Sequence, residues 1–139
     1  MMEILQPSAW PRPRGYANGV AAEGGRTVFI AGQIGWNASQ RLDHADLAGQ
    51  TRQALQNIVA VLAEAGGRPE HLTRLTWYLL DKRDYVAQAG PIGAAYREVI
   101  GRHFPAMTAV QVSALIEDGA LVEIEATAVI PRPIEPDRP

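Results

Sequence analysis

Two glutamates and a tyrosine are the residues of this chain best suited to acid–base chemistry. Glu123 and Glu125 alternate with apolar residues in LVEIEATAVI, residues 121–130, so both side chains share one face of a predicted strand. A carboxylate in a cleft could take a proton from water as a general base. On the residues alone, Glu123 is more simply interpreted as an exposed strand charge, and Tyr16 fits a packing role at a sheet edge equally well. A chemical role therefore depends on where the fold places them.

Composition excludes several other chemistries. The chain has no cysteine, which excludes disulfides, thiolate metal sites and a cysteine nucleophile. Its three histidines lack the spacing of metal ligands, so no metal is expected. The formal net charge of −2 offers no basic surface for nucleic acid and disfavours binding to anionic membranes. Neither nucleic acid nor a membrane is therefore expected as a partner.

The length of 139 residues suits a single domain with a sizeable core. We expect one domain over residues 1–139, with its core at about 15–131. The Pro-rich ends, 1–14 and 132–139, are predicted to be extended or mobile. The N-terminus has no apolar core of signal-peptide length, and no stretch is long and apolar enough for a membrane span. A cytoplasmic location is therefore expected.

The hydrophobic periodicity predicts an alternation of strands and helices. Strands are expected at residues 16–23, 27–34, 71–80, 108–115 and 121–130. The clearest helix follows Asp46, a suitable N-cap, and ends at Gly66-Gly67. A second helix is expected over about 85–101, and its regular part should begin near Pro91, because proline is tolerated in a first turn but not deep inside a helix.

The last two strands are predicted to form a hairpin, because Glu117-Asp118-Gly119 separates two alternating runs. In the final strand, Val122 and every second residue after it share the face opposite the glutamates. Both helices are expected to cover one face of a mixed sheet. The other face is semi-apolar, and such a face is often buried in an oligomer.

Five segments, in this order and spacing, carry a family resemblance: RGYANGV, FIAGQIGWN, QTRQALQNIVAVLAEAGG, YREVIGRHFPAMTAV and LVEIEATAV. Together they resemble the RidA family, also called YjgF/YER057c/UK114, over roughly residues 15–131. The resemblance implies an α+β, chorismate-mutase-like fold with a mixed β-sheet and two helices on one face. It also implies a homotrimer that forms a central barrel, with small-molecule clefts between subunits. Archetypal members hydrolyse reactive enamines and imines, notably 2-aminoacrylate, to ketoacids and ammonia, without a metal or organic cofactor.

The resemblance assigns roles to three residues that match the family pattern. Tyr16 corresponds to the cleft tyrosine, and Gly32 to the glycine of the Gly-Gln pair at the strand end. Glu123 corresponds to the carboxylate that orients the attacking water. This assignment favours a cleft position for Glu123 over an exposed strand charge.

Three positions depart from the family pattern. Gly93 lies near a family asparagine, and Ala109 replaces a cysteine. Met107 stands where active deaminases have the arginine that binds the substrate carboxylate. Methionine has no donor, so an unpaired carboxylate beside it would cost on the order of several kcal/mol, and 2-aminoacrylate should bind poorly. The other interpretation of Met107 is simple core filling.

Two further residues are candidates for the substrate site. Arg14 is the best local substitute for the missing arginine, and Trp36 either forms an aromatic wall of the cleft or only packs. The favoured function is an enamine/imine deaminase-type hydrolase that acts on a small imine other than 2-aminoacrylate. A non-catalytic small-molecule-binding trimer of the same fold is the alternative. RNA cleavage, an older label of the family, is disfavoured by the acidic pI of about 5.9.

Overall fold

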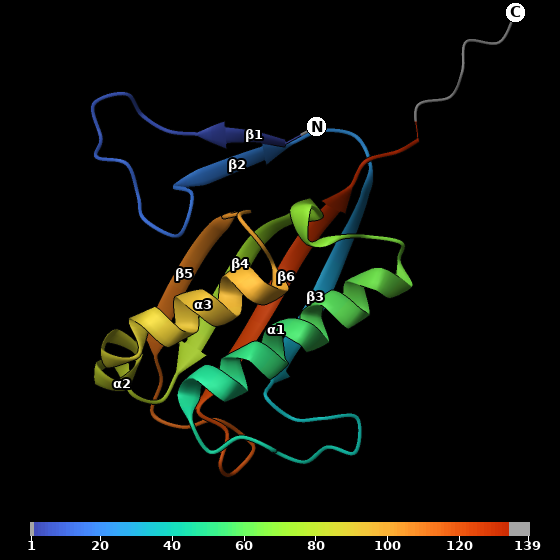
Figure 1. The fold of residues 1–139 in the computed structure, drawn as a ribbon. Helices are drawn as coiled ribbons and strands as arrows, with labels where there is room; N and C mark the ends of the chain where they lie inside the picture. Colours follow the sequence, from blue (N-terminus) through green and yellow to red (C-terminus); the bar gives the residue numbers. More distant parts are fainter. Residues whose placement is uncertain (1, 134–139) are drawn as a thin grey trace, which may run out of the picture.

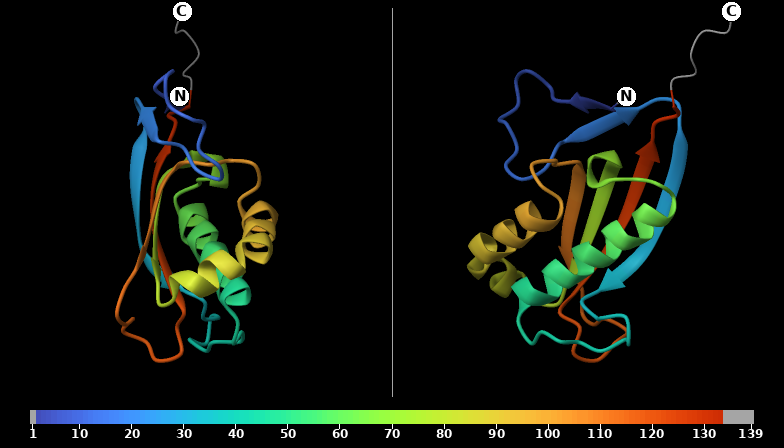
Figure 2. Two further views of the ribbon diagram at one scale, coloured as in Figure 1. Left: turned by 90° about the vertical axis from the view of Figure 1, so that its left-hand side faces the viewer. Right: turned by 45° about the vertical axis from the view of Figure 1, so that its right-hand side comes forward.

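A four-stranded mixed sheet carries three helices on one of its faces in the computed structural model, which describes residues 2–133 (Figure 1). The strand order is β3-β6-β4-β5, with β5 parallel to β4 and the other neighbours antiparallel. The strands are β3 (Arg26–Ile34), β4 (Leu72–Leu79), β5 (Ala106–Gln111) and β6 (Val122–Ile130). Figure 2 shows the helices on one face and the other face uncovered. The predicted α+β class with a mixed sheet is confirmed.

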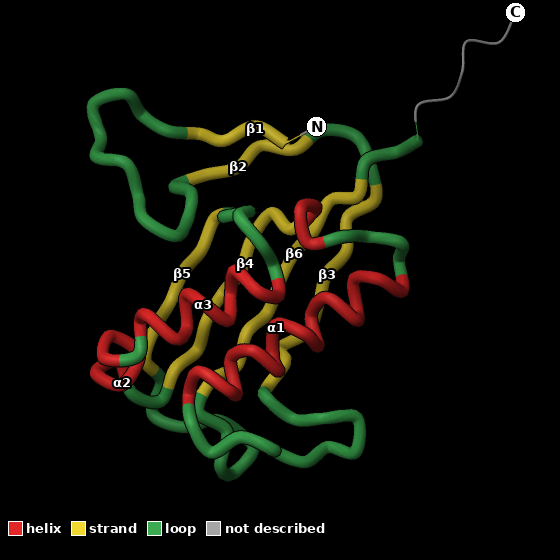
Figure 3. Tube along the Cα trace, in the orientation of Figure 1, coloured by secondary structure: helices red, strands yellow, loops and turns green. Residues whose placement is uncertain are grey.

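The N-terminal segments form a separate two-stranded sheet, β1 (Met2–Leu5) with β2 (Gly19–Ala22), which lies beyond one end of the main sheet (Figure 3). The strand expected within residues 16–23 is therefore present as β2, but it pairs with β1, inside the N-terminal segment predicted to be extended or mobile, and not with the main sheet. Just before β2, the backbone N–H of Ala17 donates to the Pro105 carbonyl at 2.9 Å. Residues 14–17 are thereby held beside the start of β5. Most of the predicted C-terminal tail, residues 134–139, lies outside the described residues.

Helix α1 (Leu47–Glu64) follows its predicted signals closely. The Asp46 side chain accepts from the Gly49 N–H at 3.1 Å and caps the first turn. After the last turn, Gly66 takes a φ of +78°, a conformation that favours glycine and ends the helix. The inner face of α1 buries Leu55, Ile58 and Leu62 completely.

The predicted second helix is two helices, α2 (Lys82–Ala87) and α3 (Ala89–Val99), which meet at Gln88. The predicted start at about residue 85 lies inside α2, whose N-cap is Asp81. Its side chain caps α2 by accepting from the Arg83 N–H at 2.8 Å. Pro91 lies in the first turn of α3, as its chemistry requires. No helix within residues 2–133 has both the length and the apolar character needed to cross a membrane.

The predicted hairpin is wrong, because β5 and β6 are not neighbours: β4 lies between them. The turn at 117–119 exists, and Gly119 has a φ of +85°. However, β5 ends at Gln111 rather than at 115, so this turn belongs to the longer connection over 112–121. That connection carries the chain past the end of β4 to the centre of the sheet.

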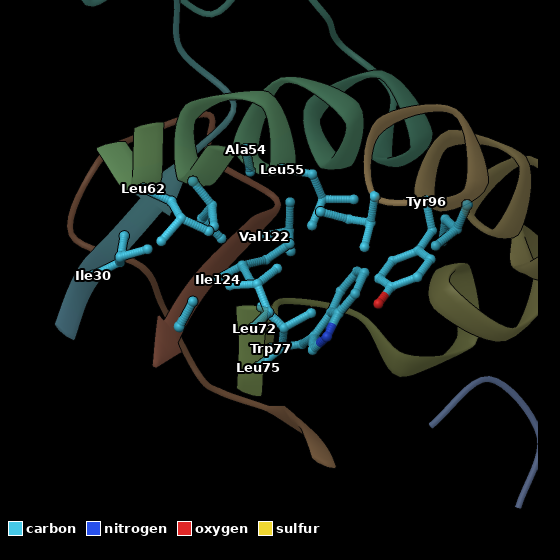
Figure 4. Packing of buried hydrophobic residues seen from close by; sticks show 14 of the residues in the cluster. Ile30, Ala54, Leu55, Leu62, Leu72, Leu75, Trp77, Tyr96, Val122 and Ile124 are labelled. Atoms are coloured by element: carbon cyan, nitrogen blue, oxygen red, sulfur yellow. The ribbon is translucent and has the colours of Figure 1, made fainter. Parts of the chain in front are cut away.

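The core lies between the helices and the covered face of the sheet (Figure 4). On β6, Val122, Ile124, Ala126 and Ala128 are buried, as the alternation predicts. On β4 a register shift between Leu72 and Arg74 breaks strict alternation, so that Leu72 is buried together with Leu75. The glutamates of β6 point to the uncovered face.

Gln50 of α1 joins two loops to the helix through a buried side chain. Its Nε2 donates to the carbonyls of His44 (3.0 Å) and Gly119 (2.9 Å), and its Oε1 accepts from the Leu121 N–H at 2.7 Å. Only 1% of Gln50 is exposed. Gln50→Ala should lower the free energy of unfolding by about 2 kcal/mol or more, because three backbone groups lose their partner.

Denaturant unfolding at one fixed protein concentration measures this loss. The matched control is Gln56→Ala, at an exposed position of the same helix, which should change the free energy by no more than about 0.5 kcal/mol. Equal effects of the two substitutions would contradict the role of Gln50.

Candidate functional site

A polar cluster occupies the uncovered face of the sheet, where Glu123 and Glu125 of β6 lie beside Tyr78 of β4. Tyr78 is the register partner of Glu123, and its hydroxyl donates to Glu125 Oε1 at 2.8 Å. The pKa of Tyr78 is raised above 10.0. The largest cause is this hydrogen bond, and desolvation and the negative charges of Glu125 and Glu123 add to it. The phenol therefore stays protonated and fixes Glu125.

Gly32 of β3 makes room for the Glu123 carboxyl group. β3 has a register shift between Ile30 and Gln33, the irregularity that its interior glycine indicates. A Cβ atom built on Gly32 would lie only 2.8 Å from Cδ of Glu123. The absence of a side chain at Gly32 therefore lets Glu123 lie against the bulged backbone, and two residues that the sequence pointed to are in contact.

A cavity of about 790 Å³ lies at the β5 edge of the sheet, on the face covered by α2 and α3. Met107 and Ala109 line it from β5, where their register partners are Leu75 and Trp77, whose side chains lie in the core. Gly93 lines it from α3, and Arg14 and Tyr16 line it from the segment held beside β5. The structure thus brings five of the eight candidate site residues to one cavity, and Met107 is half-buried at its wall.

Four aromatic rings also line the cavity, and the sequence alone does not predict this role for them. Trp77 lies 6.4 Å from both Tyr85 and Tyr96 between ring centroids, and Tyr96 stacks on Phe104 at 5.4 Å. The Tyr96 hydroxyl donates to the His103 carbonyl at 2.6 Å, and burial raises the pKa of Tyr96. Periodicity marks such residues as apolar, but it does not reveal that their packing leaves a cavity. Arg97 also lines the cavity, which its position in the sequence alone does not reveal.

The two groups of candidate residues lie on opposite faces of the sheet. Glu123 and Gly32 are on the uncovered face, whereas Met107 and Ala109 line the cavity on the covered face. One copy of the chain therefore does not combine the glutamate with the cavity.

Trp36 joins neither group. It lies in the loop after β3, where its carbonyl accepts from Asn57 Nδ2 at 2.9 Å, and it does not line the cavity. As for a metal, residues 2–133 contain no cluster of three histidine or acidic side chains that could bind one.

Known proteins similar to this chain are found by sequence and by structure. The family model described as endoribonuclease L-PSP matches residues 9–130. A RutC family protein of Pyrococcus horikoshii is 37% identical over 130 residues, which cover 92% of this chain and 98% of that protein. The 2-iminobutanoate/2-iminopropanoate deaminase of Bos taurus is 37% identical over 105 residues, 75% of this chain and 73% of that protein. A crystal structure of a Rid-family protein of unknown function from Yersinia pestis matches with a TM-score of 0.79 and 35% identity, covering 93% of this chain and 98% of that one.

Proposed function

Because the chain belongs to the Rid (YjgF/YER057c/UK114) family, which includes proteins named imine deaminases, we propose that it hydrolyses a small reactive imine other than 2-aminoacrylate. The observation that carries this proposal is the contact between Glu123 and Gly32. It provides a carboxylate, held against bare backbone, that can activate water. The reaction would take place in clefts between copies of the chain.

A homotrimer is proposed because the glutamate and the cavity lie on opposite faces of one chain. A second copy could bring its Glu123 to the Met107 cavity of the first. The uncovered face also supports association, because Phe29 of β3 (80% exposed) and Val110 of β5 (41% exposed) are both large apolar residues on it. A sheet face that exposes large apolar side chains is suited to burial against a second copy. In the arrangement that the family resemblance implies, three such faces would form a central barrel.

The proposed reaction adds water across the C=N bond. Glu123 takes a proton from water while the oxygen attacks the imine carbon, and it then passes this proton to the nitrogen, which becomes the amine of a carbinolamine. As the carbinolamine collapses, Glu123 takes the hydroxyl proton and transfers it to the departing nitrogen, so that the carbonyl forms and ammonia leaves. Tyr16 and the backbone near Gly32 would orient the substrate. The hydrolysis changes no oxidation state, so it requires no redox partner.

Met107 supports a substrate other than 2-aminoacrylate. With methionine in the cavity wall, β5 offers no side-chain donor to a carboxylate at this position. Arg14, which lines the same cavity, is one available anchor, and the aromatic wall favours an apolar substrate. The three departures at Gly93, Met107 and Ala109 also favour the alternative function, a trimer that binds a small molecule without catalysis.

The proposal is tested by a panel of imines generated in situ by an amino acid oxidase, with ketoacid formation measured above the spontaneous rate. We expect acceleration with the imines of phenylalanine and leucine, and little acceleration with 2-aminoacrylate. Ligand binding without acceleration of any imine would overturn the hydrolase and favour the binding trimer.

A further inference from the structure

The cavity beside α3 has apolar walls but positive charge at its edge. Arg97 and Arg14 both line it and are exposed. Among residues 2–133, neither side chain has an ion pair or a hydrogen bond, whereas Arg52 is paired with Glu98 at 2.7 Å. No aspartate or glutamate of the described chain lines the cavity. Two guanidinium groups are therefore available to an anion, and no acidic group in the lining competes with it.

Arg97 lies one helical turn after Gly93, and its guanidinium packs over the bare backbone there. A Cβ atom at Gly93 would lie 3.3 Å from Nη1 of Arg97, so a larger residue would have to share this space. Gly93 and Met107 are both departures from the family pattern, and both line this one cavity. Met107 removes the expected cation from β5. Gly93 leaves room for a cation, Arg97, from α3.

The apolar lining of the cavity indicates a ligand larger than a three-carbon acid. In a single copy of the chain its volume is about 790 Å³, within the range of about 300–1,000 Å³ that is typical of ligand pockets. Trp77, Tyr85, Tyr96 and Phe104 supply aromatic surface, and Met107 supplies a flexible thioether that adapts to the shape of a ligand. A small polar substrate would leave most of this apolar surface unfilled.

We propose that this cavity binds a carboxylate with a large apolar side chain, and that the Arg97 guanidinium binds the carboxylate group. The planar fork of arginine suits two parallel hydrogen bonds to a carboxylate. The claim that such a molecule is also hydrolysed rests on the proposed function, whose substrate class it specifies. The substrate is a 2-imino acid with an aromatic or branched side chain, and the product is the corresponding 2-keto acid.

Calorimetric titration of the full chain with phenylpyruvate, a stable keto acid of this class, tests the proposal without turnover. Phenylpyruvate should bind more tightly than pyruvate, which lacks the large side chain, and more tightly than phenylacetone, which lacks the charge. Arg97→Gln should weaken phenylpyruvate binding by about 10- to 100-fold, the loss expected when a charged group no longer donates to the carboxylate. Arg97→Lys should restore part of the affinity.

The matched control is Arg83→Gln, because Arg83 is an exposed arginine of α2 that does not line the cavity. It should leave the affinity unchanged. Wild-type affinity in Arg97→Gln, or equal binding of phenylpyruvate and phenylacetone, would overturn this inference. If imines are hydrolysed but Arg97 is dispensable, only this inference fails; if Arg97 binds phenylpyruvate but no imine is hydrolysed, only the proposed function fails.

Discussion

Glu123→Gln is expected to lower kcat for imine hydrolysis by about 10²- to 10⁴-fold, the usual contribution of a general base. Glutamine has the same shape as glutamate but takes no proton from water. The Glu123 side chain lies against Gly32 and is half-buried on the uncovered face, so the substitution should leave the fold intact. Ketoacid formation from the imine of phenylalanine, measured at saturating substrate, gives the change in kcat.

Glu125→Gln is the matched control for this experiment. Glu125 lies on the same face of β6, but its carboxylate accepts from Tyr78 rather than lying against Gly32. Its replacement should reduce kcat far less than Glu123→Gln. Equal losses of kcat in the two variants would indicate that the total charge of the cluster matters and that Glu123 is not a specific base. A wild-type kcat in Glu123→Gln would show that Glu123 is not the general base.

Met107→Arg is expected to raise kcat/KM for 2-aminoacrylate by about 100-fold or more. The substitution places a guanidinium fork at the cavity wall, and a bidentate pair with a carboxylate supplies two charge-assisted hydrogen bonds. Met107 is half-buried and faces the cavity, so the longer side chain has space to extend. The measurement is ketoacid formation from 2-aminoacrylate generated in situ.

Two other variants at the same position separate the fork from charge and volume. Met107→Lys should give a smaller gain, because lysine is a point charge without the planar fork. Met107→Leu keeps the apolar wall and should give none. If Met107→Arg is no better than Met107→Leu in a folded protein, position 107 is not the site of carboxylate binding.

Local signals predicted the helices and strands better than they predicted the neighbours of each strand. Asp46 and Gly66 fix the two ends of α1 through contacts within a few residues, so the sequence contains the evidence for them. The hairpin failed because Gly119 makes a turn whatever the two flanking segments pair with. The choice of β4 as the neighbour of both β5 and β6 depends on long-range packing, which a local turn does not report.

Residues of the candidate site that belong to the family pattern could be predicted from the sequence. Residues that only the packing brings to the site could not. Gly32 and Glu123 were both singled out, and they are in contact. Tyr78 was not, because its bond to Glu125 depends on which strand lies beside β6. Arg97 was not singled out either, because its sequence position alone does not reveal that the bare backbone at Gly93 lets it line a cavity.

Mixed oligomers test most directly the central claim that one active site combines the Glu123 of one copy with the cavity of another. Glu123→Gln subunits would be coexpressed with Gly93→Trp subunits, whose added indole fills the cavity, and the mixed oligomers would be isolated through two different tags. Each variant alone should be inactive. In each isolated mixed trimer, one of the three sites pairs an intact cavity with an intact glutamate from its neighbour, so roughly a third of the wild-type rate should be restored. A mixed oligomer that stays as inactive as its parents would contradict the shared site.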